Sequence, residues 1–198
     1  MRPIAVGETL RRLVAKCMCA ALQQAAAARL SPTQVGVGVQ GGCEAAVHAV
    51  AAAIAQHHDD SDFVLCKVDF ANAFNQSSRQ FLDLLYGDAA LSGARAWVWA
   101  CYGRQTSLWW HDVAIGCRTG VQQGDPLGPL LFSLVLRVLT DRIREVAPGL
   151  AANVWFLDDG TFVGRTDDVL RALAVIVAEG PALGLHNKYK KTAMVECA

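Results

Sequence analysis

A near-continuous apolar segment, residues 63 to 70 (FVLCKVDF), most constrains what this chain can fold into. Such a segment predicts a central β-strand that is covered on both of its faces. A second extended pattern, at residues 153 to 164, has apolar flanks around Asp158-Asp159-Gly160 and predicts a β-hairpin. A buried strand and a hairpin together predict a sheet that helices must cover.

The other segments show mostly helical patterns. The pattern predicts helices at residues 8–30, 43–56, 77–86, 91–102, 126–146 and 166–183, a strand pair at 104–118 and a last strand at 191–197. From residue 63 the order is strand, helix, inserted helical and strand material, helix, hairpin, helix, strand. This order is compatible with a split βαβ sheet covered by helices on one face, although order alone does not fix the topology.

Composition excludes several classes of protein. The chain has 198 residues, of which 53% are apolar, so it can bury a sizeable core. Its seven cysteines are odd in number and form no CxxC pair, which argues against a zinc site or a disulfide framework. No apolar run reaches the length of a membrane span, and no signal peptide is visible. We therefore expect an intracellular protein with reduced thiols, in either the nucleus or the cytoplasm.

The charge pattern is compatible with two interpretations of the basic residues. The formal net charge is zero, which argues mildly against a protein that binds nucleic acid over its whole surface. Two local basic clusters occur, one near each end of the chain: Arg2, Arg11, Arg12, Lys16 and Arg29, and then Lys188, Lys190 and Lys191. Either cluster could face phosphates, but from spacing alone a solvated helix face or terminus is the more common explanation.

Three carboxylates carry the most specific chemical signal. Asp69 ends the predicted buried strand, and Asp158 and Asp159 lie at the tip of the predicted hairpin. If the hairpin lies beside the strand, the three converge, and their mutual repulsion favours a bound divalent cation. Magnesium accepts carboxylate oxygens together with substrate phosphates, and two such ions can clamp a phosphoryl displacement. The competing explanation is that Asp-Asp-Gly is only turn chemistry, and without further context we favour it.

Two other patterns are weaker. Residues 36 to 41 (GVGVQG) match the glycine fingerprint of dinucleotide-binding folds, but a helical pattern rather than a strand precedes them. The run His57-His58-Asp59-Asp60 contains metal-binding residue types, yet neighbouring residues in one loop rarely share a metal. We expect a loop in both places.

Six blocks along the chain give the context that the carboxylates need. They are RPIAVGETLRRLVAKC (2–17), GVGVQGGCEAAVHAV (36–50), KVDFANAFN (67–75), GVQQGDPLGPLLFSLVL (120–136), WFLDDGTFVG (155–164) and GLHNKYKKT (184–192). In order, they resemble two fingers segments and motifs A, B, C and D of reverse transcriptases, particularly those of non-LTR retroelements. The resemblance covers essentially the whole chain, and motifs B and C are highly specific together.

The resemblance implies an α/β right-hand polymerase palm with a ferredoxin-like split βαβ sheet. Residues 1–62 would be partial, helical fingers, and residues 63–198 the palm, with a fingers-like insertion at about 89–118; the thumb would be absent. The implied activity is RNA-templated DNA synthesis by two-metal nucleotidyl transfer. The implied cofactor is Mg²⁺, as two ions, with Mn²⁺ as a substitute. The implied partners are an RNA template, a DNA primer and deoxynucleoside triphosphates, with no membrane; the oligomeric state is not implied.

The resemblance also assigns roles to individual residues. Asp69, Asp158 and Asp159 would be the catalytic metal ligands, with Asp159 the less critical, and the backbone carbonyl of Phe70 would be a further ligand. Phe74, five residues after Asp69, would be the aromatic gate that excludes a ribose 2′-hydroxyl. The other nucleotide-binding residues would be Gln123, Gly124, Arg2 and Lys191, with Lys190 as the alternative to Lys191.

The chain departs from the family's pattern in two places. Leu157 precedes the motif C aspartates where many members have Ala or Met, a change that we do not regard as disabling. Motif D has lost one residue between Leu185 and Asn187, which leaves the register of its lysine open. The missing thumb predicts weak or no processive synthesis. It also motivates an alternative function: a degenerate or domesticated retroelement fragment with the fold but no polymerase activity.

Overall fold

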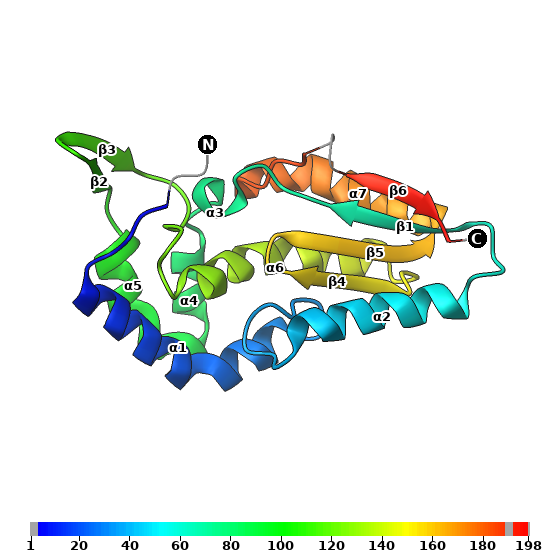
Figure 1. The fold of residues 1–198 in the computed structure, drawn as a ribbon, viewed down its shortest axis with the longest axis horizontal. Helices are drawn as coiled ribbons and strands as arrows, with labels where there is room; N and C mark the ends of the chain where they lie inside the picture. Colours follow the sequence, from blue (N-terminus) through cyan, green and yellow to red (C-terminus); the bar gives the residue numbers. More distant parts are fainter. Residues whose placement is uncertain (1–3, 189–191, 198) are drawn as a thin grey trace.

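A four-stranded antiparallel sheet lies at one end of the molecule and a two-stranded hairpin at the other (Figure 1). The computed structural model describes residues 4–188 and 192–197. The sheet has the order β4-β5-β1-β6, built from β4 (Ala152–Phe156), β5 (Asp159–Arg165), β1 (Phe63–Val68) and β6 (Ala193–Glu196). The apolar segment that predicted a central strand is thus an inner strand with a neighbour on each side.

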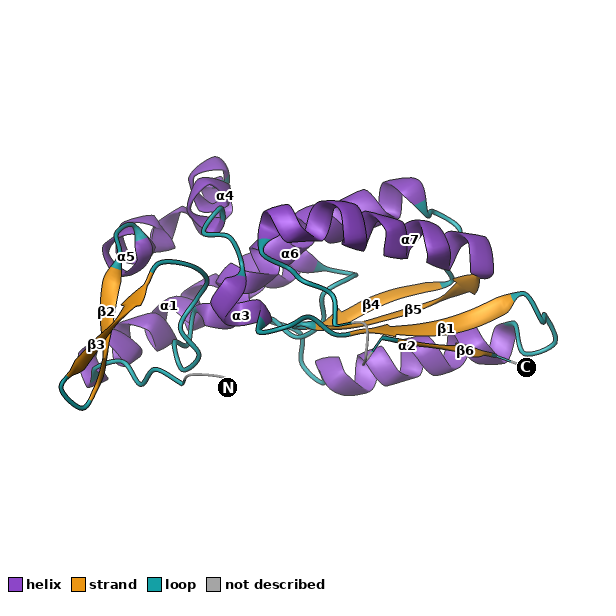
Figure 2. Ribbon diagram, turned by 90° about the horizontal axis from the view of Figure 1, so that it is seen from above, coloured by secondary structure: helices purple, strands orange, loops and turns teal. Residues whose placement is uncertain are grey.

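Helices cover both faces of this sheet to different extents (Figure 2). Helices α6 (Gly128–Val146) and α7 (Thr166–Glu179) pack on one face, where Cys66 and Val68 of β1 enter the main core. Helix α2 (Gly42–Gln56) packs on the opposite face, against β4 and β5. The expectation of a single covered face is therefore incomplete, because α2 covers the second face over β4 and β5.

The other half of the molecule is mainly helical. It contains α1 (Thr9–Leu30), α4 (Phe81–Gly87), the 3-10 helix η1 (Ala89–Ala94) and α5 (Arg95–Tyr102). The hairpin formed by β2 (Thr106–Trp110) and β3 (Val113–Cys117) projects beyond these helices (Figure 1). No helix within residues 4–188 and 192–197 is long and apolar enough to cross a membrane.

The predicted helix at residues 77–86 is wrong in its first turn. A short helix, α3 (Ala73–Gln76), ends where the Ser77 N–H donates to the Ala73 carbonyl, and Ser77 is extended. The Ser78 N–H then donates to the carbonyl of Leu183, in the 3-10 helix η2 (Gly180–Leu183), at 2.7 Å. A tertiary hydrogen bond therefore breaks a segment whose local pattern is helical.

Candidate active site

The register of β1 and β5 brings the predicted catalytic carboxylates to one end of the sheet. The last pair of this ladder is Val68 with Gly160, so the next residues along the two strands are Asp69 and Asp159. Phe156 pairs with Asp159, so Leu157 and Asp158 form the two-residue connection between β4 and β5. The structure therefore places Asp69 beside the hairpin tip that carries Asp158 and Asp159.

The backbone of Phe70 faces the same hairpin. The Lys188 N–H donates to the Asp69 carbonyl at 2.9 Å, and the Ala71 N–H donates to the His186 carbonyl at 2.8 Å. These two bonds flank the antiparallel pair of Phe70 with Asn187. In such a pair the N–H and C=O of the enclosed residue point away from the partner. The Phe70 carbonyl thus points away from Asn187 and toward the side of β5.

The side chain of Gln34 holds the hairpin tip in place through three hydrogen bonds. Its Oε1 accepts hydrogen bonds from the N–H groups of Leu157 (2.8 Å) and Gly36 (2.9 Å), and its Nε2 donates to the Leu157 carbonyl (3.1 Å). Leu157 has φ +56°, a left-handed conformation that costs a side-chain-bearing residue about 1–2 kcal/mol. The buried amide of Gln34 therefore fixes a strained residue directly before Asp158.

No sequence pattern marked Gln34, because it lies in an irregular loop between two helices. The same loop explains the glycine fingerprint at residues 36–41. A Cβ on Gly36 would lie 2.8 Å from the Leu157 nitrogen, so glycine is needed for the close approach of the loop to the hairpin. Helix α1 and a turn precede this loop, whereas a dinucleotide-binding fold requires a strand there.

A lysine lies at the first carboxylate. The Nζ of Lys188 is 3.6 Å from Oδ2 of Asp69, and the Asp69 side chain is 14% exposed. Lys188 belongs to the basic cluster near the end of the chain, for which a solvated terminus was the more common explanation. The predicted motif D lysines, Lys191 and Lys190, lie outside the described residues, as does Arg2.

The fit of this site to magnesium depends on the chemistry of its donors. Within residues 4–188 and 192–197, no group of three or more His, Cys, Asp or Glu side chains is arranged to hold a metal ion. Magnesium in phosphoryl-transfer sites is usually held by one or two carboxylates together with water and substrate phosphates. Asp69, Asp158 and the Phe70 carbonyl supply oxygen donors of this kind, so the residues present fit the ion.

His57 stacks on Phe63 with ring centroids 3.9 Å apart, which accounts for one member of the His-His-Asp-Asp loop without a metal.

Three of the predicted nucleotide-binding residues line one pocket. Phe74, Gln123 and Gly124 border a cavity of about 230 Å³ at the start of α6. The ring of Phe74 stacks on Phe132 of α6, with centroids 4.5 Å apart and planes 19° apart. Gly124 has φ +116°, and a Cβ there would lie 2.6 Å from the Ala5 carbonyl oxygen. The N-terminal segment thus lies against this loop, where the Ala5 N–H donates to the Gln123 carbonyl.

A buried network fixes the loop that carries Gln123 and Gly124. Asp125 Oδ2 accepts hydrogen bonds from the Tyr102 hydroxyl (2.7 Å) and from Arg11 (3.2 Å), and its Oδ1 accepts the Leu127 N–H (3.0 Å). The pKa of Tyr102 is raised well above its usual value, first by burial and then by the negative charge of Asp125. The hydroxyl therefore stays protonated and acts as a donor. Asp125 has a structural role, and Arg11 pairs with Asp125 instead of facing a free phosphate.

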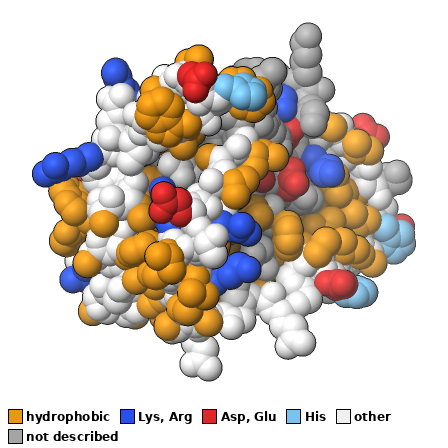
Figure 3. All heavy atoms as spheres, turned by 60° about the vertical axis from the view of Figure 1, so that its left-hand side comes forward, with side chains coloured by type: hydrophobic (Ala, Val, Ile, Leu, Met, Phe, Trp, Pro, Cys, Tyr) orange, Lys and Arg blue, Asp and Glu red, His pale blue; other side chains and the backbone are white. Residues whose placement is uncertain are grey.

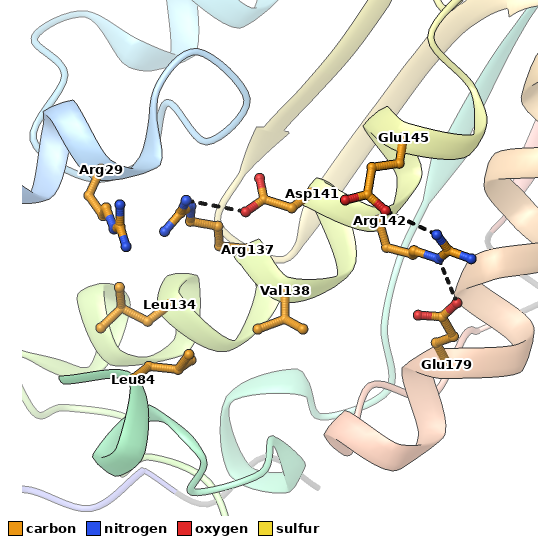
Figure 4. A pocket seen from close by; sticks show the side chains of 9 residues that line it. All are labelled: Arg29, Leu84, Leu134, Arg137, Val138, Asp141, Arg142, Glu145 and Glu179. Atoms are coloured by element: carbon orange, nitrogen blue, oxygen red, sulfur yellow. Dashed lines mark hydrogen bonds and ion pairs between the residues drawn. The ribbon is translucent and has the colours of Figure 1, made fainter. Parts of the chain in front are cut away.

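A charged groove lies on the outer side of α6 (Figure 4). Its ion pairs are Arg137–Asp141 (3.2 Å), Arg142–Glu145 (3.0 Å) and Arg142–Glu179 (3.3 Å). Figure 4 shows these side chains turned toward one another. Because the opposite charges neutralise each other, the groove offers little to a charged ligand.

Comparisons with known proteins agree with the resemblance seen in the sequence. The family model for reverse transcriptase (RNA-dependent DNA polymerase) matches residues 1–197. The chain is 28% identical to the retrotransposable element SLACS 132 kDa protein of Trypanosoma brucei gambiense, over 98% of this chain and 16% of that protein. It is 35% identical to the Pol polyprotein from the type-1 retrotransposable element R2 of Popillia japonica, over 41% of this chain and 15% of that protein. The chain thus spans about a sixth of the length of these relatives.

Solved structures show the same fold at low sequence identity. Telomerase from Candida albicans, in complex with a fragment of telomeric RNA, superposes with a TM-score of 0.61 at 14% identity, over 96% of this chain and 36% of that one. Apo telomerase from Candida tropicalis gives 0.60 at 10% identity, over 97% of this chain and 36% of that one. The predicted α/β, palm-like polymerase fold is therefore confirmed. Since the family model spans nearly the whole chain, the protein belongs to the reverse transcriptase (RNA-dependent DNA polymerase) family.

Proposed function

We propose that this chain catalyses RNA-templated DNA synthesis at the end of the sheet where β1 meets the β4–β5 hairpin. The observation that carries the proposal is the register of β1 with β5, because it puts Asp69 beside the tip that bears Asp158 and Asp159. The clamp from Gln34 supports it, since a precisely held tip is what catalytic carboxylates require.

In the proposed reaction, the 3′-hydroxyl of a DNA primer attacks the α-phosphate of a deoxynucleoside triphosphate, and pyrophosphate leaves. Asp69, Asp158, Asp159 and the Phe70 carbonyl would hold two Mg²⁺ ions, for which Mn²⁺ could substitute. When bound, these ions lower the pKa of the attacking hydroxyl and stabilise the charge on the leaving pyrophosphate. The protein contributes by holding the reacting groups in line.

The pocket at the start of α6 would select the sugar of the incoming nucleotide. The stacking of Phe74 on Phe132 gives the Phe74 ring a fixed position at the edge of this pocket. A ring held against the 2′ carbon leaves no room for a ribose hydroxyl, so deoxynucleotides would be preferred. Gln123 and Gly124, which line the same pocket, would contact the nucleotide or the template. Arg2 and Lys191, or Lys190, would neutralise phosphate charge, as the family resemblance implies.

The test is templated single-nucleotide incorporation. Purified chain is mixed with Mg²⁺, an RNA template annealed to a DNA primer, and each deoxynucleotide or ribonucleotide in turn. The proposal predicts that only the complementary deoxynucleotide is added efficiently. Equal use of ribonucleotides would contradict the proposed selection at Phe74. Addition that ignores the template would contradict templated synthesis.

The second candidate is a retained fold without polymerase activity. It is favoured by the formal net charge of zero, since polymerases that hold a long duplex draw on many contacts between basic side chains and phosphates. A chain that is folded by circular dichroism but incorporates no nucleotide with Mg²⁺ or Mn²⁺ would support this candidate and contradict the first.

A further inference from the structure

Helix α1 carries apolar side chains on two opposite faces. Its inner face packs on η1 and α6 through four buried residues, Ala15, Leu22, Ala26 and Leu30. A second apolar row, the outer row, recurs every three or four residues, at Leu10, Leu13, Cys17 and Ala21. Since an α-helix has 3.6 residues per turn, the outer row lies on the side opposite to the inner face. In Figure 1, α1 runs along the lower left edge of the molecule, and the other described elements lie on one side of it.

The outer row is open to solvent. Leu10 is 74% exposed and Leu13 is 55% exposed, and Cys17 and Ala21 are exposed as well. The segment that leads into the helix adds Val6, which is 75% exposed. Single exposed leucines are common on protein surfaces, whereas apolar side chains gathered on one face indicate an interaction site. The outer row is therefore a surface that another apolar surface can cover.

The charges of α1 are all of one sign. Residues 9–30 contain four basic side chains and no acidic one. Two of them, Arg11 and Arg29, pair with aspartates outside the helix, at 3.2 Å and 2.8 Å. Arg12 and Lys16 are exposed, and in the described part of the chain neither forms an ion pair. Because each residue turns the helix by about 100°, Arg12 and Lys16 lie along one flank of the outer row.

This surface therefore combines apolar and basic side chains. Figure 3, which brings this end of the molecule forward, shows Lys and Arg side chains beside hydrophobic ones. The negative charge that Arg12 and Lys16 would attract is not supplied by their own helix, since α1 contains no Asp or Glu. A complementary partner must bring both an apolar row and its own acidic groups.

This requirement distinguishes between the possible occupants. If two copies of the chain packed α1 against α1, neither helix would supply an acid for the basic flank of the other. A nucleic-acid backbone would pair with Arg12 and Lys16 but would leave Leu10 and Leu13 in water. An amphipathic helix with apolar residues at positions i, i+3, i+4 and i+7 and carboxylates beside them would satisfy both features. The small side chain of Ala21 would let such a helix approach closely.

We propose that the outer face of α1 docks an acidic amphipathic helix of a protein partner. The apolar row of the partner covers Leu10 and Leu13, and its carboxylates pair with Arg12 and Lys16. The docked helix leaves the network around Asp125 intact, because Arg11 reaches that network from another side of α1. The inference is independent of the proposed function, since docking needs neither metal nor nucleotide.

The experiment measures binding of the full chain to a synthetic fluorescein-labelled peptide by fluorescence anisotropy. The peptide has about 18 residues, long enough to form a helix, with Leu at helical spacing and Glu at the flanking positions. A comparison peptide has Lys in place of every Glu. The acidic peptide should bind at least about 10-fold more tightly than the basic one, and added salt should reduce the difference.

The leucines are tested by a double variant. Leu10→Ala/Leu13→Ala should weaken binding of the acidic peptide by roughly 10-fold or more, because two apolar side chains are no longer buried on docking. The matched control is Leu170→Ala, which removes a leucine that is 49% exposed on α7. This control should bind the acidic peptide as the wild type does.

The basic flank is tested by reversing its charge. Arg12→Glu/Lys16→Glu should bind the basic peptide more tightly than the acidic one, whereas damage to the fold would weaken binding of both peptides. Circular dichroism confirms that each variant is folded.

Four results would overturn the inference. The wild type could bind neither peptide, or bind both equally. The double leucine variant could bind the acidic peptide as tightly as the Leu170 control does. Sedimentation could show a dimer of the wild type that Leu10→Ala/Leu13→Ala dissociates, which would assign the face to a second copy. The chain could instead bind anionic phospholipid vesicles through the same leucines and bind no peptide. Failure of the proposed function looks different, since peptide binding would persist while no nucleotide is incorporated.

Discussion

Two hairpins in the described part of the chain have similar tips, an aromatic residue followed by one residue and an aspartate, but very different surroundings. Trp110-His111-Asp112 forms the tip of β2–β3, and Phe156-Leu157-Asp158 forms the tip of β4–β5. In each, the residue before the aspartate has a positive φ, +50° at His111 and +56° at Leu157. An aspartate in such a tip is thus ordinary turn chemistry, as the local sequence suggested.

What separates the two hairpins is the structure around them. The β4–β5 tip joins the edge strand β4 to the inner strand β5, lies next to the end of β1, and is clamped by the side chain of Gln34. The β2–β3 hairpin has no further strand beside it in its sheet, and both of its faces meet solvent. The β4–β5 tip is therefore held in a fixed position, whereas the β2–β3 hairpin exposes most of its side chains to solvent.

The largest expected effect on stability is at the held hairpin. Trp155 on β4 is fully buried, and its ring stacks with Phe70 and contacts Phe162 edge-on. Trp155→Ala should lower the free energy of unfolding by about 3–5 kcal/mol, because it empties a large space in the core. Chemical denaturation measures this change. A loss below about 1 kcal/mol, the typical effect of an average substitution, would mean that the two hairpins are equally dispensable.

The next largest effect is at the clamp. Gln34→Ala removes three hydrogen bonds and should cost about 1–3 kcal/mol, because it leaves partly buried backbone groups of Leu157 and Gly36 unpaired. If the clamp positions Asp158, the rate of nucleotide incorporation at saturating substrate should also fall in protein that is still folded. Gln24→Ala, in an exposed part of α1, is the matched control. A stability loss with an unchanged rate would show that the tip keeps its geometry without Gln34.

A smaller effect concerns selection of the nucleotide. Phe74→Val should reduce the preference for deoxynucleotides over ribonucleotides by roughly 10-fold to 200-fold, the range expected when a pocket loses a close apolar contact. The conservative variant Phe74→Tyr retains the ring and should retain the preference. Competition between the two nucleotide types at one template position measures it. An unchanged preference in Phe74→Val would remove Phe74 from the proposed site.

The smallest effect on stability is at the exposed hairpin. Trp110→Ala should change the free energy of unfolding by about 0.5 kcal/mol or less, since the indole makes few buried contacts. The same denaturation experiment as for Trp155 checks this. A large loss in the free energy of unfolding would show that the exposed hairpin contributes to the stability of the fold.

The sequence predicted the core of the sheet well because its signals are local. The apolar run at residues 63–70 and the hairpin at 153–164 appear as β1, β4 and β5, and most predicted helices appear within a few residues of their expected bounds. The break at Ser77 was not predictable, because the hydrogen bond from Ser78 to Leu183 joins residues far apart in the chain.

The residue types of the candidate site were predictable from the sequence, whereas the residues that hold them in position were not. The family resemblance named Asp69, Asp158, Phe74 and Gln123, and the structure brings the first two to one edge and the last two into one pocket. Gln34 and Arg79 carry no local pattern, because each acts on a distant segment through a single side chain. Lys188 belongs to a basic cluster in the sequence, but its ion pair with Asp69 is not visible there. Contacts of this kind appear only once the chain is folded.

The most direct test of the central claim compares the two aspartates at the two tips. Single-nucleotide extension of a primer on an RNA template is measured for the wild type, Asp158→Ala and Asp112→Ala. We expect Asp112→Ala to keep the wild-type rate, whereas Asp158→Ala should lose on the order of 10³-fold or more, because a metal ligand stabilises the transition state by several kcal/mol. Equal rates for the two variants would contradict the claim that the chemistry takes place at the edge beside Asp69.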